Sequence, residues 1–109
     1  MVDVVQNNLD KIINTCRQHY VQTLYLFGSA ARENDFTENS DLDFLVCFET
    51  LPANTLDDIQ FLVNNYDSLQ EKLEDITNRK VDLIKEENIK NRFLKYFINK
   101  DRLLIYGLS

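Results

Sequence analysis

The chain has 109 residues, of which 44% are hydrophobic and 28% are charged, and its formal net charge is −6. This composition supports one folded domain spanning residues 1–109 and argues against disorder. The acidic balance argues against direct electrostatic binding of DNA or RNA, because phosphate backbones repel it.

The N-terminal residues predict a helix, a strand and a short helix, in that order. Apolar residues recur at helical spacing from Val4 to Cys16, which predicts one amphipathic helix ending near His19. Residues 23–27 predict a buried strand that stops at Gly28. A short helix is expected over 29–32, and the polar residues 33–39 predict a loop. The single histidine, His19, is assigned no catalytic role because a cation is common at a helix end.

Residues 41–48 predict a second strand with two different faces. Side chains alternate along a strand, so one face carries the apolar residues and the other carries Asp41 and Asp43. Thr55 is expected to cap a helix whose apolar stripe runs on to Ile76, either as one helix or as two segments.

The C-terminal part predicts a third strand over 81–84 and a last helix that Asn88 could cap. Phe93, Tyr96 and Phe97 could stack on a base, but their helical spacing favours packing in the core. Residues 103–106 predict an edge strand or a packed tail. This order of elements predicts an α+β fold in which helices pack on a small mixed sheet.

The extent of apolar stretches and the use of cysteine bear on location. No stretch approaches the length of a membrane span, and residues 1–10 lack the features of a signal peptide. Cys16 and Cys47 are far apart and are expected to be thiols in a reducing compartment. We therefore expect a cytoplasmic protein that makes no membrane contact.

Two short segments carry residues suited to phosphate and metal chemistry. Gly28 and Ser29 follow a strand and open a helical turn, where a close backbone and free N–H groups could hold a phosphate. The alternative is an ordinary turn with a cap. Asp41 and Asp43 point the same way at the start of a strand, so both could reach one pair of Mg²⁺ ions. The alternative is a solvated acidic strand entry, but the buried run that follows favours acids with a compensating charge.

Asp82 is the third candidate acid, because it stands between Val81 and Leu83 in a short apolar strand. A carboxylate is costly there unless it is paired, exposed on one face or bound to metal. A solvated edge strand and a metal site are equally acceptable interpretations of this residue alone. Three carboxylates on neighbouring strands would make a two-metal site.

These segments resemble a known family. The run LFGSAAR at residues 26–32, followed by SDLDFLV at 40–46, resembles the signature of the minimal nucleotidyltransferases of the DNA polymerase beta superfamily. VDLI at 81–84 resembles their third acidic strand, and the order of elements also matches. The resemblance implies a nucleotidyltransferase fold. The chain departs from the family pattern at Glu33, where glycine is usual, and in a longer loop before Asp41, which affects the phosphate contacts most.

The resemblance also implies roles for individual residues. Asp41, Asp43 and Asp82 would bind two Mg²⁺ ions, or Mn²⁺, and would form the catalytic site. The residues implied in binding the nucleotide, ATP, are Gly28, Ser29, Arg32 and Ser40. For Arg32, bracing of the loop by an ion pair is favoured over contact with phosphate.

Small members of this family commonly act as antitoxins paired with a HEPN-domain ribonuclease toxin, and they transfer AMP to a tyrosine of that toxin. The resemblance therefore implies a protein partner, with no direct contact to nucleic acid. Two alternatives remain open. One is transfer to a small-molecule acceptor, and the other is an antitoxin that neutralises its toxin by binding alone.

Overall fold

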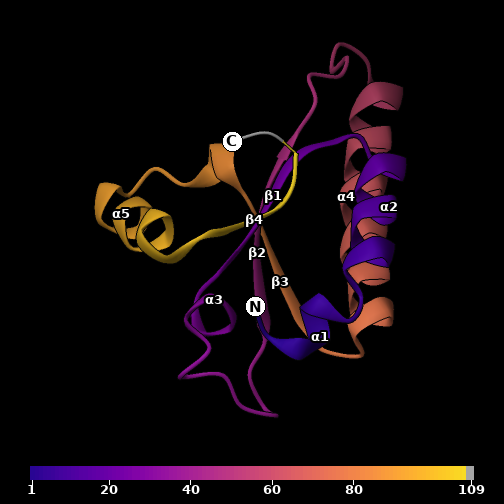
Figure 1. Ribbon diagram of the computed structural model, residues 1–109. Coiled ribbons are helices and arrows are strands. Elements are labelled where there is room, and N and C mark those ends of the chain that lie inside the picture. The colour runs from indigo at the N-terminus through magenta and orange to yellow at the C-terminus, as the bar shows by residue number, and fades with distance from the viewer. Residues whose placement is uncertain (108–109) are drawn as a thin grey trace.

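The computed structural model describes residues 1–107, which form one four-stranded sheet with helices on both faces (Figure 1). The sheet is mixed, as expected, in the order β3-β2-β1-β4, with β2 and β3 parallel and the other neighbours antiparallel. The elements, in chain order, are α1 (Asp3–Gln6), α2 (Leu9–Gln18), β1 (Val21–Phe27), α3 (Ser29–Arg32), β2 (Leu42–Phe48), α4 (Leu56–Thr77), β3 (Val81–Lys85), the 3₁₀ turn η1 (Glu86–Asn88), α5 (Arg92–Asp101) and β4 (Leu103–Tyr106).

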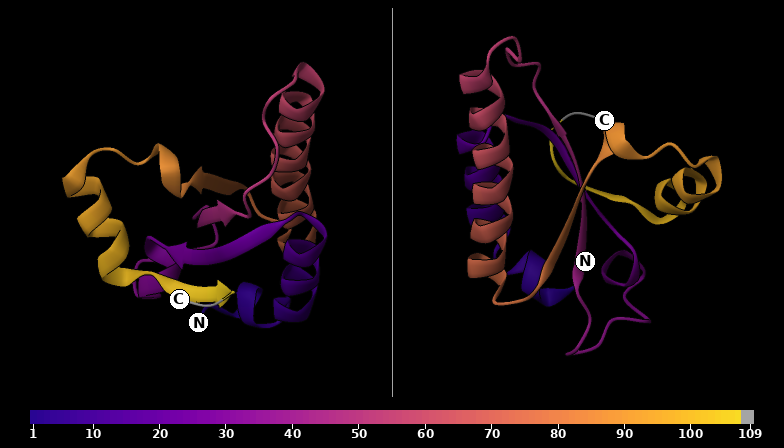
Figure 2. Two further views of the ribbon diagram at one scale, coloured as in Figure 1. Left: turned by 90° about the horizontal axis from the view of Figure 1, so that it is seen from above. Right: turned by 180° about the vertical axis from the view of Figure 1, so that it is seen from behind.

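The two faces of the sheet are covered differently (Figure 2). Helices α2 and α4 lie on one face and enclose the main core, to which alternate residues of β2 contribute Leu42, Phe44 and Val46. Helices α3 and α5 lie on the other face, where only a small buried cluster forms between Tyr25, Leu45 and Ile98. The predicted alternation of β2 is thus confirmed, and the second face stays largely open around Asp43.

The predicted first helix is wrong in one respect, because it is divided into α1 and α2. The break falls at Asn7 and Asn8, and the Asn8 side-chain amide donates to the carbonyl of Val4 at 2.7 Å. Asparagine competes with the helix for its own backbone groups, which explains why apolar spacing alone missed the break.

The long helix α4 is continuous and begins as predicted. Thr55 accepts a hydrogen bond from the amide of Asp58 at 3.1 Å, and the Asp58 carboxylate accepts from the amide of Thr55 at 3.2 Å, which forms a capping box. The last helix is capped by Asn91, not by Asn88, which lies in η1. Asn91 takes this role because its side chain accepts from the amides of both Phe93 and Leu94.

Two further expectations can be compared with the structure. His19 is buried at the end of α2, with one ring nitrogen 2.7 Å from the carbonyl of Thr15 and the other 3.0 Å from the Ser68 hydroxyl, so its polar atoms are used in packing. Over the described residues, no helix combines the length and the apolar character required to cross a bilayer.

Candidate active site

Asp43 and Asp82 lie side by side on the open face of the sheet. They are direct register partners on the parallel strands β2 and β3. Residues in register on neighbouring strands point to the same face, so the two carboxylates share the side that α3 and α5 flank. Asp43 is half-buried, whereas Asp82 and Asp41 are exposed. Asp41 precedes β2 by one residue and continues the same alternation.

Gly28 brings the end of β1 against Asp43. Its neighbour Phe27 is the register partner of Asp43 on the other side of β2. A Cβ atom built on Gly28 would collide with the Oδ2 of Asp43 and would lie 3.3 Å from its Cγ. Gly28 also adopts φ +69° and ψ −149°, a conformation that is essentially restricted to glycine. Glycine therefore lets the turn into α3 and the carboxylate occupy adjoining space.

The electrostatics of Asp43 reflect its acidic neighbours. Burial first, and then the charges of Asp82 and Asp41, together raise the pKa of Asp43 to about 6, while Arg32 opposes the shift. Repulsion between neighbouring carboxylates favours the protonated form, whereas a cation bound beside them favours the charged form. The donor set consists of carboxylate oxygens, which are the ligands that Mg²⁺ and Mn²⁺ prefer.

The acids do not form a ready-made cage. Throughout residues 1–107, no three Asp, Glu, His or Cys side chains are close enough together to enclose a metal ion. Asp41 and Asp82 are near enough to influence the pKa of Asp43, but both are exposed to solvent. The donor chemistry thus fits a divalent ion that also takes oxygens from a bound triphosphate.

Side chains of α4 hold β3, and with it Asp82, in place. Gln70 donates to the carbonyl of Val81 at 3.0 Å, and Glu74 accepts from the amide of Val81 at 3.0 Å. The hydroxyl of Tyr66 donates to the carbonyl of Leu83. These contacts use three backbone groups of β3, so the strand is held one residue before and one residue after Asp82.

Arg32 makes the ion pairs that the sequence favoured. Its Nε lies 3.0 Å from the carboxylate of Asp35, and its Nη1 lies 3.5 Å from that of Asp101. The guanidinium thus links α3 to the following loop and to α5. Ser40 has a local role as well, because its hydroxyl accepts from the amide of Thr37 at 2.9 Å. The roles of Arg32 and Ser40 in nucleotide binding stay predictions.

The departure at Glu33 has a visible backbone consequence. Glu33 adopts φ +64° at the end of α3, a left-handed value that favours glycine. Glycine, which the family pattern has at this position, would adopt this conformation with less strain. The longer loop that follows, residues 33–41, contains no helix or strand.

Sequence reasoning missed one residue near the site, Arg79. Residues 78–80 fall between the predicted helix and the predicted third strand, and they carry no motif. In the structure Arg79 Nη1 donates to the carbonyls of Thr37 and Ser40, each at 2.9 Å. The only available signal was an arginine shortly before Asp82.

The aromatic residues of α5 contradict the core packing that their spacing favoured. Phe93, Tyr96 and Phe97 are 73%, 64% and 62% exposed. Of the α5 side chains, Ile98 is buried, so the helix touches the sheet through a narrow contact. Helical spacing correctly predicts one apolar side but cannot tell a core contact from an open surface.

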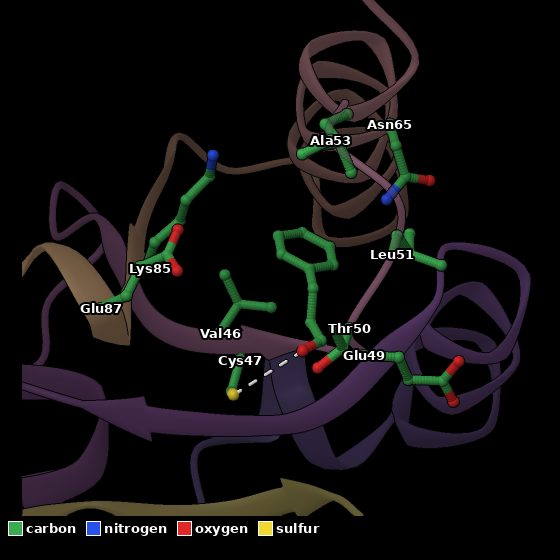
Figure 3. A pocket seen from close by; sticks show the side chains of 11 residues that line it. Val46, Cys47, Glu49, Thr50, Leu51, Ala53, Asn65, Lys85 and Glu87 are labelled. Carbon is green, nitrogen blue, oxygen red and sulfur yellow. Dashed lines mark hydrogen bonds between the residues drawn. The ribbon is translucent and has the colours of Figure 1, made fainter. Parts of the chain in front are cut away.

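A separate cavity of about 350 Å³ opens at the far end of β2 (Figure 3). Cys47, Lys85 and Glu87 are among the side chains around it. None of the predicted site residues lines this cavity in the described structure, because Asp43 stands at the opposite end of the strand. Asp41 and Asp82 are exposed, so the acidic site lies on an open surface of the described structure.

The chain is similar to known proteins in both sequence and fold. Residues 10–108 match the model of the family "Polymerase beta, Nucleotidyltransferase". A protein of Methanocaldococcus jannaschii named "Putative protein adenylyltransferase" is 38% identical over 89 residues, which span 82% of this chain and 79% of the relative.

Three solved structures share the fold. A "putative minimal nucleotidyltransferase" gives a TM-score of 0.72 at 24% identity over 94% of this chain and 95% of the other. A toxin–antitoxin complex with AMP-PNP gives 0.68 at 24% identity, covering 94% and 75%. The complex of a tri-AMPylated Shewanella oneidensis HEPN toxin with its MNT antitoxin gives 0.62 at 23% identity, covering 94% and 72%.

Proposed function

Since this chain belongs to the polymerase beta nucleotidyltransferase family, we propose that it transfers AMP from ATP to a tyrosine hydroxyl of a HEPN-domain toxin and thereby acts as an antitoxin. Three findings support this choice of substrate and acceptor. A relative is named as a protein adenylyltransferase. One structure of the same fold belongs to a complex with AMP-PNP, and another to a complex with a tri-AMPylated HEPN toxin.

The observation that carries the proposal is the register of Asp43 with Asp82 beside Gly28. It places two carboxylates together on one open face, next to Gly28, which has no side chain of its own. A purely structural acidic pair would gain nothing from this arrangement, because like charges in proximity destabilise each other. A site for metal ions and a triphosphate requires it.

Each residue has a distinct role in the proposed reaction. Asp41, Asp43 and Asp82 would hold two divalent ions, Mg²⁺ or Mn²⁺, and Gly28 with Ser29 would contact the triphosphate. The bound ions would offset the triphosphate charge and polarise the acceptor oxygen. The tyrosine oxygen would bond to the α-phosphorus as the bond to the bridging oxygen breaks, so that pyrophosphate leaves. Asp82 would help to remove the hydroxyl proton.

The surface of α5 supports a protein acceptor over a small molecule. The helix lies on the same side of the sheet as the acids (Figure 1), and it presents Phe93, Tyr96 and Phe97 to solvent. Exposed aromatic side chains grouped in this way mark interaction sites. We call this group the α5 aromatic surface. A protein bound there would lie beside the site, and a tyrosine on a flexible segment could then reach it.

The charge around α5 supports the same choice. Lys90, Arg92, Lys95 and Lys100 lie in or next to the helix and are exposed, although the whole chain carries a net charge of −6. The contact region is thus basic within an acidic molecule. A molecule that carries a basic patch on an otherwise acidic surface can orient a partner as well as attract it. The cytoplasmic location expected from the sequence is part of this proposal.

The test is transfer to the co-encoded partner. The chain, ATP, Mg²⁺ and the partner are incubated together, and the partner is analysed by intact-mass spectrometry for added AMP. The Asp41→Asn, Asp43→Asn double variant should give no added mass. Asp10→Asn, which makes the same chemical change on α2, should transfer AMP normally.

The alternatives predict different results. A partner that is inhibited without added mass would support an antitoxin that works by binding alone. Transfer to a small hydroxyl compound but not to the partner would support the small-molecule acceptor. Calorimetry gives a second test, because ATP should bind measurably with Mg²⁺ and only weakly in chelator; equal affinities would contradict the metal roles of the three acids.

A further inference from the structure

We infer that Arg79 is a positioning residue that holds the loop before β2 so that Asp41 enters the strand with its carboxylate beside Asp43 and Asp82. This inference rests on the proposed function for its consequence in metal binding. The placement itself follows from contacts between two segments that are distant in sequence.

The guanidinium of Arg79 bonds to the loop at successive points. Nη1 donates to the carbonyls of Thr37 and Ser40 at 2.9 Å each, and the carbonyl of Glu38 lies 3.4 Å away. Ser40 directly precedes Asp41, so the last of these bonds fixes the peptide from which Asp41 begins. The cation thus binds three carbonyl oxygens of the loop, and that of Thr37 also accepts from the amide of Ser40.

The ring of Phe36 supports the guanidinium from its other side. The Cζ of Arg79 lies 4.3 Å from the centre of that ring, the geometry of a cation–π contact. Phe36 itself packs against the main core. Contacts therefore run from the core through Phe36 and Arg79 to the carbonyls of the loop. They end next to Asp41, the first acid of the site.

The backbone around Arg79 explains how it reaches this place. Asn78 ends α4 in the left-handed conformation, with φ 52° and ψ 39°, and turns the chain towards β3. The adjoining Lys80 accepts at its carbonyl from the amide of Leu42 at 3.0 Å, which aligns β2 with β3. Arg79 thus stands just before β3, next to the residue that is bonded to the start of β2.

Among the other side-chain contacts of the loop, the Arg32–Asp35 pair and the bond from the Thr37 amide to the Ser40 hydroxyl are local. Its internal bonds form a small turn in which the Ser40 amide donates to the carbonyl of Thr37 at 3.1 Å. Thr37, Glu38 and Asn39 are exposed. A lysine could reach one carbonyl but could not reproduce the planar donor set or the stacking on Phe36, so arginine and lysine should differ at this position.

The first test needs no metal. Hydrogen exchange of residues 37–41 is compared between the unmodified chain, Arg79→Ala and Arg79→Lys, with Arg17→Ala on α2 as the matched control. Exchange should rise most in Arg79→Ala, rise less in Arg79→Lys and stay unchanged in Arg17→Ala. Unchanged exchange in Arg79→Ala, with the fold intact by circular dichroism, would overturn the inference.

The second test measures affinity for Mn²⁺ in the presence of ATP, by electron paramagnetic resonance. Loss of a residue that orients a metal ligand typically weakens metal binding by about 10–100-fold, and we expect that range for Arg79→Ala. Raising the metal concentration should restore most of the turnover, because the ligands themselves remain. Arg79→Ala that binds Mn²⁺ as tightly as the unmodified chain would refute the inference. If the unmodified chain bound no Mn²⁺, the proposed function would fail, while the exchange experiment would still decide the role of Arg79 in the loop.

Discussion

Replacing Gly28 by alanine tests the link between backbone conformation and the acidic site. The residue has φ +69° and ψ −149°, where an alanine costs about 1–3 kcal/mol. Restricting the unfolded chain returns about 0.4–1 kcal/mol. Through the backbone alone, the free energy of unfolding should therefore fall by about 1–2 kcal/mol. In a chain of 109 residues, a fall of about 2 kcal/mol lowers Tm by roughly 9 °C, given the usual entropy of unfolding per residue.

The new methyl group should also displace the Asp43 carboxylate, whose Oδ2 occupies the position that the Cβ requires. The end of this side chain can rotate away, so the collision adds only about 1 kcal/mol to the loss of stability. The displaced carboxylate would no longer face Asp82, and metal-dependent ATP binding should fall sharply. The two effects are thus separable in measurement.

Urea denaturation of the unmodified chain, Gly28→Ala, Asp43→Ala and the double variant forms a double-mutant cycle. Backbone strain should persist without the carboxylate, whereas the collision should vanish, which gives a coupling of about 1 kcal/mol. Gly28→Ala with unchanged stability would refute the conformational argument. A cycle without coupling would show that the carboxylate does not lie against Gly28.

Three other changes have expected outcomes. The raised pKa of Asp43, about 6, means that the folded state binds a proton more readily than the unfolded chain. Without metal, its contribution to stability should therefore fall as pH rises from about 4 to 6, and Asp43→Asn should remove this fall in denaturation curves. Glu33→Gly should raise the free energy of unfolding by up to about 1 kcal/mol in thermal denaturation, because glycine tolerates φ +64°; lower stability would show that the side chain matters more than the backbone. On the α5 aromatic surface, Phe93→Ser with Phe97→Ser should leave stability within about 0.5 kcal/mol, since both side chains are mostly exposed. The same pair should weaken binding to the partner toxin in calorimetry, whereas Phe61→Ser on α4 should not, and equal affinities would place the interface elsewhere.

The strands were predictable because period-two patterns and burial coincide in them. In β2, Leu42, Phe44 and Val46 turn to the core while Asp43 turns away, and this follows from alternation alone. Asp82 lies on the same face as Asp43 because of the parallel register between β2 and β3, and the residues around either acid do not encode that register. Family resemblance supplied that information.

The errors fall where polar side chains compete for the backbone or where a surface is apolar. Asn8 divides a helix whose apolar spacing is unbroken. Asn91 rather than Asn88 caps α5, and the difference depends on the path of the chain after β3. Phe93 has the spacing of a core residue, but the sequence does not reveal that this side of the helix faces solvent. Arg79 acts on carbonyls, which any sequence has, so its role leaves no motif.

The contacts of α4 with β3 have a consequence for how the sheet meets other chains. An edge strand normally offers its free amides and carbonyls to any strand that approaches, which leads to aggregation or to recognition by strand addition. Side chains of α4 already bond three backbone groups at this edge, which are the amide and carbonyl of Val81 and the carbonyl of Leu83. An incoming strand would have to displace three side-chain bonds before forming its own. The acid-bearing edge is thereby protected from extension of the sheet by another strand.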